Sequence, residues 1–247
     1  MENIIIIFIN YYIDEFNSKN QLIYQRNLSD ISEKNRLDAE YFLPKYEIIF
    51  KKIKENTKNN NWEIKTIGEI SEPLRYGTSE NLTYLNKGIP FLRITDIQDF
   101  RFEKDLVVFI SKEIAKEVSY ASVQEGDLII SRSGTLGLTI PITREFSNSI
   151  FGSYFIRIRP KIKINQKYLA LYLNSFLGQI QIERISTGAI QTNLTIPAIE
   201  SIEVVIPTLD FQEKISEFLD KSERLNKKAK QLLKQAKVKL EDSIEKR

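Results

Sequence analysis

The C-terminal stretch 211–247 constrains the fold more than any other part of the chain, because it contains neither Gly nor Pro. Apolar residues recur along it at helical spacing, with Ser222 at the one skipped position: Ile215, Phe218, Leu225, Ala229, Leu232, Ala236 and Leu240. This heptad-like spacing predicts a helix with an apolar stripe suited to pack along another helix. Asp210 and Glu213 form a candidate capping box at its start.

Two interpretations of this helix remain open. At 1.5 Å per residue it would be roughly 55 Å long, which is long for burial against one domain of this size. We therefore favour an arm for dimerisation or partner docking over a helix packed within one monomer. Its segment 227–239 carries only basic charge. We favour a solvated face there, and the alternative is contact with nucleic acid phosphate or an acidic partner.

The composition excludes several kinds of chemistry. The chain has no Cys and no His, and its net charge is only +3. Disulfide and thiolate chemistry is therefore absent, which favours a reducing cytoplasm, and the commonest general base and metal ligand are missing. Glycine-rich nucleotide loops, an S-adenosylmethionine loop and the Asn/Asp-Pro-Pro-Tyr segment of amino-methylating enzymes are also missing. We expect a binding protein with no catalytic residue, no metal and no cofactor of its own.

The order of elements predicts an α+β fold, in which a mixed α/β domain is followed by the long helix. Three parts are expected: a partly helical N-terminal segment packing on the main domain (1–61), a recognition domain (62–207) and the helix (208–247). The apolar run 4–9 is too short for a membrane span and lacks the basic residues of a secretory signal. A polar loop is expected at 55–61, after a helix at 47–54.

Short β-like runs alternate with turns inside the central part of the chain. Strands are predicted at 89–94, 106–110, 127–131, 138–142, 150–159 and 202–206. In the strand 150–159, Tyr154, Ile156 and Ile158 are expected on one face, and Phe155, Arg157 and Arg159 on the other. Ser111 predicts the start of a short helix, and Asn165 the start of a helix that stops at Gly178.

Five segments, taken together and in this order, resemble the specificity (S) subunit of Type I restriction–modification systems. They are RLDAEYF with PKY (36–46), GIPFLRITDI (88–97), EGDLIISRSGT (125–135), GAIQTNL (188–194) and IPTLDFQ (206–212). The third is similar to the family's GDLLISRSGT run and the fourth to its GxxQxNL turn. The resemblance covers about residues 36–247 and leaves the first 30 residues outside.

The resemblance implies both a fold and a function. A complete family member has two target-recognition domains, each followed by a conserved helix, and the helices form an antiparallel coiled coil. This chain has one such set, so it resembles a half-length subunit that recognises double-stranded DNA without catalysis. S-adenosylmethionine would then be held by a separate methyltransferase (M) subunit, and cleavage would belong to a restriction (R) subunit where one exists.

The expected partners are therefore DNA, the M subunit, and either a second copy of this chain or another specificity chain. A homodimer would read an inverted repeat around an unread spacer. The alternatives are a stand-alone DNA-binding regulator, an antagonist of such a complex or, least favoured, an enzyme acting on nucleic acid. For that last alternative, Asp210, Glu213 and Lys214 superficially resemble a nuclease cluster, although helix capping explains them.

The predicted DNA contacts combine motif residues with two stretches expected to read the sequence, 75–81 and 146–154. Gln191 and Asn193 carry donor and acceptor pairs that suit adenine, although we favour a role in bracing a loop. Arg159 and Arg184 are further basic candidates. The predicted DNA-binding set is Arg75, Tyr76, Thr78, Arg93, Arg132, Ser133, Thr135, Ser153, Tyr154, Arg157, Gln191 and Asn193. The predicted partner-helix set is Ile215, Phe218, Leu225, Leu232, Ala236 and Leu240.

Overall fold

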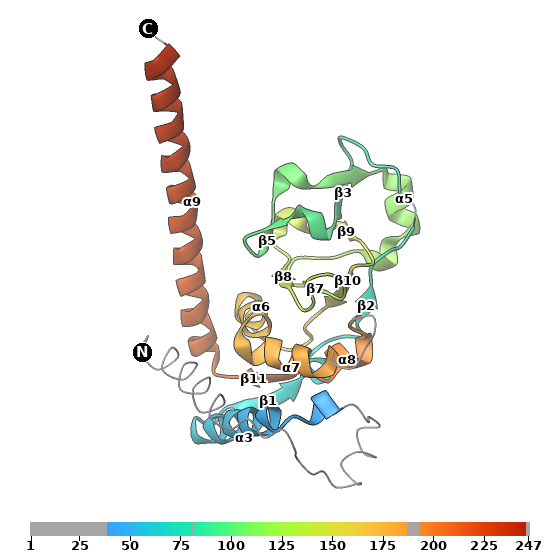
Figure 1. The fold of residues 1–247 in the computed structure, drawn as a ribbon. Coiled ribbons are helices and arrows are strands. Elements are labelled where there is room, and N and C mark those ends of the chain that lie inside the picture. Colours follow the sequence, from blue (N-terminus) through green and yellow to red (C-terminus); the bar gives the residue numbers. More distant parts are fainter. Residues whose placement is uncertain (1–38, 81, 187–192, 246–247) are drawn as a thin grey trace.

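A computed structural model describes residues 39–80, 82–186 and 193–245. The expectations for the apolar run 4–9 and for most of the N-terminal segment lie outside these residues. Helix α9 (Leu209–Glu245) rises along one side of an α/β body, and most of its length stands clear of that body (Figure 1). Among the described residues, no helix is long and apolar enough to cross a membrane.

The body is built from short elements. Its helices are α3 (Pro44–Asn59), α4 (Ile67–Ile70), α5 (Lys112–Glu117), α6 (Gln166–Asn174), α7 (Phe176–Ser186) and α8 (Ile196–Glu200). Its strands are β1 (Glu63–Thr66), β2 (Arg75–Tyr76), β3 (Ile89–Leu92), β4 (Ile97–Gln98), β5 (Arg101–Phe102), β6 (Val108–Ile110), β7 (Leu128–Ser131), β8 (Thr139–Pro141), β9 (Ile150–Phe151), β10 (Phe155–Ile158) and β11 (Glu203–Ile206). In the described part of the chain the short 3-10 helices are η1 (Ala39–Phe42), η2 (Ile94–Asp96), η3 (Lys104–Leu106), η4 (Ser119–Ala121) and η5 (Arg144–Phe146).

Four separate sheets organise these strands. The central sheet has the order β2-β10-β7-β8 and is antiparallel throughout. A three-stranded sheet, β6-β3-β9, combines an antiparallel and a parallel pair. The remaining two are antiparallel pairs, β1 with β11 and the hairpin β4–β5. The predicted α+β class, with a long C-terminal helix, is confirmed.

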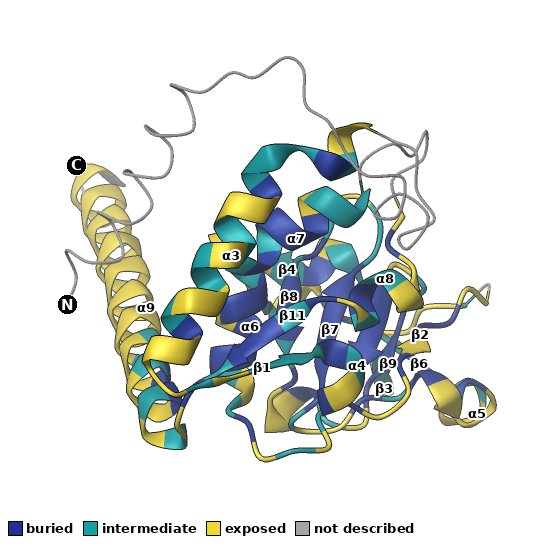
Figure 2. Cartoon of the chain, turned by 90° about the horizontal axis from the view of Figure 1, so that it is seen from below, coloured by how far each residue is buried: buried dark blue, intermediate teal, exposed yellow. Residues whose placement is uncertain are grey.

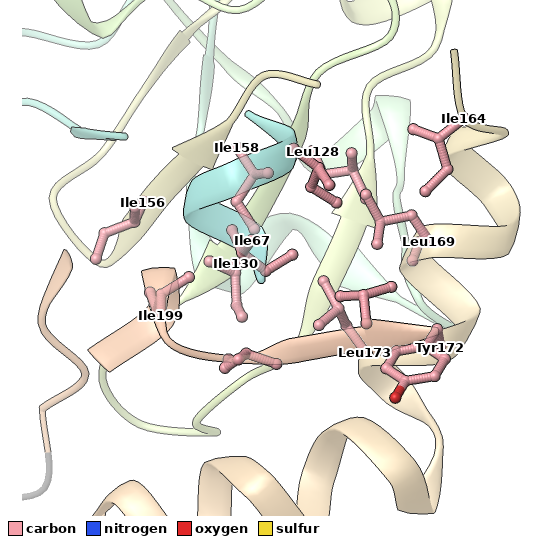
Figure 3. Close-up of a cluster of buried hydrophobic side chains, with 14 of the residues drawn as sticks. Ile67, Leu128, Ile130, Ile156, Ile158, Ile164, Leu169, Tyr172, Leu173 and Ile199 are labelled. Atoms are coloured by element: carbon pink, nitrogen blue, oxygen red, sulfur yellow. The ribbon is translucent and has the colours of Figure 1, made fainter. Parts of the chain in front are cut away.

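The central sheet is covered on both faces. Because side chains alternate along a strand, Leu128 and Ile130 of β7 enter one hydrophobic cluster while Ile129 enters the other. The first cluster packs β7 and β10 against α4, α6 and α8, with Ile156 and Leu173 among its members (Figure 3). The second lies between this sheet and the β3 sheet. Figure 2 shows the resulting buried centre, with exposed residues at the periphery.

Several sequence predictions hold at the level of single residues. The Ser111 side chain accepts a hydrogen bond from Ile114 N at the start of α5, and Asn165 accepts from Lys167 N and Tyr168 N at the start of α6. The predicted alternation in β10 is also confirmed, since Ile156 and Ile158 lie in the first cluster and Phe155 in the second.

Other predictions are wrong in ways that have physical causes. The predicted strand 150–159 is two strands, β9 and β10, which belong to different sheets. The helix expected to stop at Gly178 ends at Asn174, and Gly178 lies inside the next helix, α7. A Cβ on Gly178 would lie 2.4 Å from Leu173 O, so glycine permits the close junction of the two helices.

The end of α3 and the start of α9 also differ from the prediction. The polar run 55–59 continues α3 to Asn59 rather than forming a loop. Asp210 is not a cap, because α9 already begins at Leu209; its carboxylate instead accepts a hydrogen bond from Lys214 Nζ at 2.7 Å.

Candidate nucleic-acid interface

Arg132 is the point at which the predicted DNA-binding segments meet. Its backbone N–H donates to Tyr154 O at 2.8 Å, and its carbonyl accepts from Leu194 N at 2.8 Å. Its guanidinium stacks on the ring of Tyr76, with 4.8 Å between the guanidinium carbon and the ring centroid. One residue therefore connects the motif 125–135, the motif 188–194 and the two stretches expected to read DNA.

The side chain of Ser131 fixes the loop that follows Arg132 through two hydrogen bonds. The buried Ser131 hydroxyl accepts from Leu138 N at 2.9 Å and donates to Thr135 O. Ser133 and Thr135 are thereby kept at the surface, where Ser133 is half-buried and Thr135 is exposed. Both residues belong to the loop that directly follows Arg132 in the sequence.

The two stretches expected to read DNA lie side by side. Gly77 N donates to Phe155 O at 3.2 Å, and Thr78 pairs with Gly152 in an isolated parallel bridge. A Cβ on Gly77 would lie 2.2 Å from Gly152 O, so only glycine permits this close approach. Beside it, Arg75, Tyr76 and Tyr154 are exposed, and Ser153 is half-buried. Because side chains alternate along a strand, Tyr76 lies on the sheet face of its partner Ile156, and Arg75 lies on the opposite face with Arg157.

Tyr76 also ties this surface to the start of α8. Its hydroxyl accepts a hydrogen bond from Ile196 N at 3.2 Å. Asn193, the next-to-last residue of the GAIQTNL segment, is exposed beside Leu194, whereas Gln191 lies outside the described residues. Planar aromatic and guanidinium groups with adjacent amides are the groups that stack on bases and bond to base edges. We define Tyr76, Arg132, Tyr154 and Asn193 as the Arg132 surface.

Two other predicted DNA contacts, Arg157 and Thr78, are buried inside the protein. Arg157 is only 8% exposed and donates from Nη1 to Ser122 O at 2.6 Å, while its Nε has no partner among the described residues. Its burial lowers the pKa of its guanidinium. The prediction of an accessible Arg157 is therefore wrong, because both faces of the central sheet are covered. Thr78 is buried as well.

Arg93 and the additional arginine candidates also have internal partners. Arg93 Nη2 donates to the buried carboxylate of Asp96 at 2.7 Å and to Leu106 O at 3.1 Å. Arg159 forms a bidentate ion pair with the buried carboxylate of Asp127. Arg184 stacks on Tyr41, Tyr46 and Phe50 of the N-terminal elements. These half-buried side chains are engaged by partners within the protein, and, apart from Asp96, those partners lie too far along the chain for a local sequence pattern to reveal.

The predicted partner-helix residues form a separate surface. Ile215 packs against the first hydrophobic cluster, but Phe218, Leu225, Leu232 and Leu240 are 56–68% exposed. Ala229 and Ala236 are exposed too. We call Phe218, Leu225, Ala229, Leu232, Ala236 and Leu240 the α9 stripe. In this single chain the stripe packs against nothing described, so the interpretation of α9 as a helix packed wholly within one monomer is wrong.

The fold and these two surfaces define a class of protein: a mixed α/β recognition domain carried at the base of a long, largely bare helix. A model of the Type I restriction modification DNA specificity domain matches residues 59–237, and the chain therefore belongs to that family. The resemblance drawn from the five motifs is confirmed. The family assignment places the chain with the non-catalytic specificity component of such systems.

Individual relatives agree with this assignment. The chain is 27% identical over 162 residues to the Type I restriction enzyme StySPI specificity subunit of Salmonella potsdam, covering 64% of this chain and 34% of that protein. It is 27% identical over 167 residues to the EcoKI specificity subunit of Escherichia coli K12, covering 64% and 35%. The match thus spans about a third of the length of these relatives.

Solved structures show the same fold at low identity. A chain from a solved type I R-M system superposes with a TM-score of 0.50 at 18% identity, over 66% of this chain and 38% of that one. The type IIG restriction endonuclease BpuSI superposes with a TM-score of 0.51 at 15% identity, over 78% and 30%. At these identities the likeness concerns the fold alone.

Proposed function

We propose that this chain recognises a specific double-stranded DNA sequence and directs adenine methylation, and cleavage where an R subunit exists, by partner subunits. The observation that carries this proposal is the Arg132 surface, where two of the motif segments meet the two stretches expected to read DNA. It contains the base-stacking and amide groups that recognition requires. Function in the cytoplasm, with S-adenosylmethionine held by an M subunit, belongs to the same proposal.

Reconstitution tests the division of labour. Purified M subunit, S-adenosylmethionine and target DNA are combined with and without this chain, and methyl transfer is measured. We expect transfer only when the chain is present. Transfer by the chain alone would mean an enzyme, and DNA binding that never supports or that blocks transfer would mean a regulator or antagonist.

A pair of arginine variants tests the Arg132 surface. Arg132→Ala should weaken specific binding by about 1–3 kcal/mol if the guanidinium contacts a base. Arg144→Ala, an exposed arginine of η5, is the matched control and should bind normally. Specific binding should also weaken steeply with salt, by about 0.9 in the logarithmic slope for each phosphate contacted. If the two variants bind DNA with equal affinity, the Arg132 surface is not the DNA interface.

The α9 stripe supports a second part of the proposal, in which two copies pair through their helices. Its spacing is nearly symmetric about Ala229: Ser222 and Ala236 lie seven residues to either side, and Phe218 and Leu240 eleven. Leu225 before Ala229 is matched by Leu232 and Leu233 after it. Large residues would therefore meet large ones, and small ones small, when two helices run antiparallel about a two-fold axis at Ala229.

Such a homodimer would present two identical recognition domains in inverted orientation. The target would be an inverted repeat of short half-sites around an unread spacer, with half-sites about one helical turn apart, roughly 34 Å. Mapping methylated adenines in cells that carry this chain and its M subunit tests this prediction. An asymmetric motif would indicate pairing with a different specificity chain.

A further inference from the structure

The hairpin β4–β5 reaches from the recognition domain to the bare part of α9. Lys230 Nζ of α9 forms an ion pair with the carboxylate of Asp99 at the hairpin tip. Both side chains are about half exposed, and the ion pair lowers the pKa of the Asp99 carboxyl. Figure 1 shows β5 on the side of the body nearest α9.

Charged residues of both signs surround this contact. Below it, Arg101 of β5 lines a solvent-accessible pocket together with Glu217, Asp220, Glu223, Arg224 and Lys227 of α9. The hairpin therefore rests beside a polar face of the helix. At about 100° per residue, the α9 stripe lies largely on the other side of the helix from Lys227 and Lys230. A second helix can thus pack on the stripe without displacing the hairpin.

The base of α9 is attached separately and firmly. The buried Gln212 side chain accepts from Asn165 N at 2.8 Å and donates to Pro207 O at 2.8 Å. Ser216 Oγ donates to Asn165 Oδ1 at 2.7 Å. From Ser216 to Lys230 the helix rises roughly 21 Å. A second contact this far from the base favours one tilt of the helix against the domain, whereas a helix held only at its base can swing.

The tip of the hairpin adopts a left-handed backbone that Asp99 tolerates and that Phe100 does not favour. Asp99 and Phe100 have φ of 49° and 60°, the left-handed values of a two-residue turn that ordinarily takes Asn-Gly. Phe100 is 63% exposed, so burial of its ring does not account for this conformation. The turn nevertheless places the Asp99 carboxylate against Lys230.

We infer that the Asp99–Lys230 contact is a positioning device, which sets the angle between the recognition domain and α9 and thereby the spacer length of the bipartite target. This inference rests on the proposed function, because the angle of each domain on a shared pair of helices decides how far apart the two half-sites lie. Asp99 and Lys230 are positioning residues that need not touch DNA.

The protein alone provides the first test. Because the chain has no cysteine, spin labels can be attached only at Lys87→Cys on the domain and Gln235→Cys on α9, in labelled protein diluted with an excess of unlabelled protein. The parent should give a narrow distribution of distances and Asp99→Lys a broader or shifted one. The charge-exchanged double variant Asp99→Lys/Lys230→Asp should return to the narrow distribution. Lys234→Asp, the matched control one turn further along α9, should not change it.

DNA binding provides the second test. Inverted repeats of the mapped half-site are prepared with spacers one base pair shorter, equal and one base pair longer, and the full-length variants are titrated against each. In Asp99→Lys, the ratio of the affinity for the correct spacer to the affinity for the other spacers should fall about threefold, the size expected of one exposed ion pair. The double variant should recover it. Phe100→Gly keeps the ion pair and should keep the parent's spacer preference.

The outcomes separate this inference from the proposed function. If Asp99→Lys shows the parent's distance distribution and spacer preference, the positioning role is wrong, although the chain still recognises DNA. If the parent binds no specific DNA, the proposed function fails, and the distance measurement still reports whether the hairpin holds the helix. A change in Asp99→Lys that the charge exchange does not reverse would also overturn the inference.

Discussion

The two halves of α9 are one continuous helix with opposite environments. In the first half, Gln212 and Ser216 are buried, and Phe211 packs on Trp62 with 4.9 Å between ring centroids. From Lys221 to Ile244 every residue is exposed, including leucines spaced to form an apolar stripe. Similar apolar periodicity therefore serves two ends: in the first half it joins the domain core, and in the second it remains available to another helix.

The comparison teaches that the boundary between core and arm is set by what surrounds α9. Ile215 and Phe218 lie three residues apart on neighbouring parts of the helix, yet only Ile215 contacts the first hydrophobic cluster. The contact of α9 with this cluster ends between them, although Lys167 of α6 still pairs with Asp220 further along the helix. Predictions that act separately on the two halves can therefore break or sharpen the distinction.

The largest effect is expected from charges in the bare half. Leu225→Asp/Leu232→Asp places two carboxylates in the α9 stripe, where burial without partners is costly. We expect self-association to weaken on the order of 100-fold or more, with unchanged circular dichroism and a monomeric mass by sedimentation. Unfolding of the domain itself would show instead that the second half belongs to the core.

The anchored half should respond in stability rather than in association. Gln212→Ala leaves Asn165 N–H and Pro207 C=O without their partner, which we expect to cost about 1–3 kcal/mol in the free energy of unfolding. Gln235→Ala, the same change in the exposed half, should have almost no effect. Urea titration of both variants measures the difference, and equal midpoints would contradict the distinction between the halves.

Cysteine crosslinking sharpens the proposed pairing of the bare halves. In an antiparallel pair about Ala229, Ala229→Cys should crosslink to its own copy, because only residues near the axis bring two Cβ atoms within disulfide range. Phe218→Cys alone should not crosslink, whereas a mixture of Phe218→Cys and Leu240→Cys should. Crosslinking of Phe218→Cys with itself would indicate parallel helices.

Salt should strengthen self-association through α9 and weaken DNA binding, and this is the smallest effect that we expect. Between residues 227 and 239 every charged residue is a lysine. In an antiparallel pair about Ala229 this segment faces 219–231 of the other copy, which carries five Lys or Arg and two acidic residues, so the two helices repel each other there. Screening relieves that repulsion. Self-association should strengthen by a few-fold from about 50 to 500 mM salt, while DNA binding weakens. Sedimentation and binding titrations at both salt concentrations decide the point.

Local rules predicted much of the fold because they concern neighbours in sequence. The caps at Ser111 and Asn165 follow from a short side chain meeting the next turn of its own helix. The Gly- and Pro-free stretch gave α9, and alternation gave the faces of β10. For the same reason, the start of α9 was misplaced by only two residues, from 211 to 209.

The features that escaped prediction depend on parts distant in sequence. Arg157 was expected at the surface because one strand cannot show that both faces of its sheet are covered. The hydrogen bonds of Arg132 to Tyr154 and Leu194, and the contact of Asp99 with Lys230 across 131 residues, arise only when the chain has folded. Their residue type made these arginines candidates for DNA contact. Only the packing of the folded chain distinguishes those at the surface from those that bond to groups inside the protein.

The pairing of β1 with β11 has a consequence for how such a protein changes over time. Glu63 faces Ile206 in this antiparallel pair, so the chain enters and leaves the recognition domain at neighbouring points. A gene exchange with both breakpoints in these strands would replace everything between them in one event. The helices on either side would stay in place if the incoming segment supplied an equivalent of Asn165 beneath α9. A new DNA specificity could then be inherited as a single cassette.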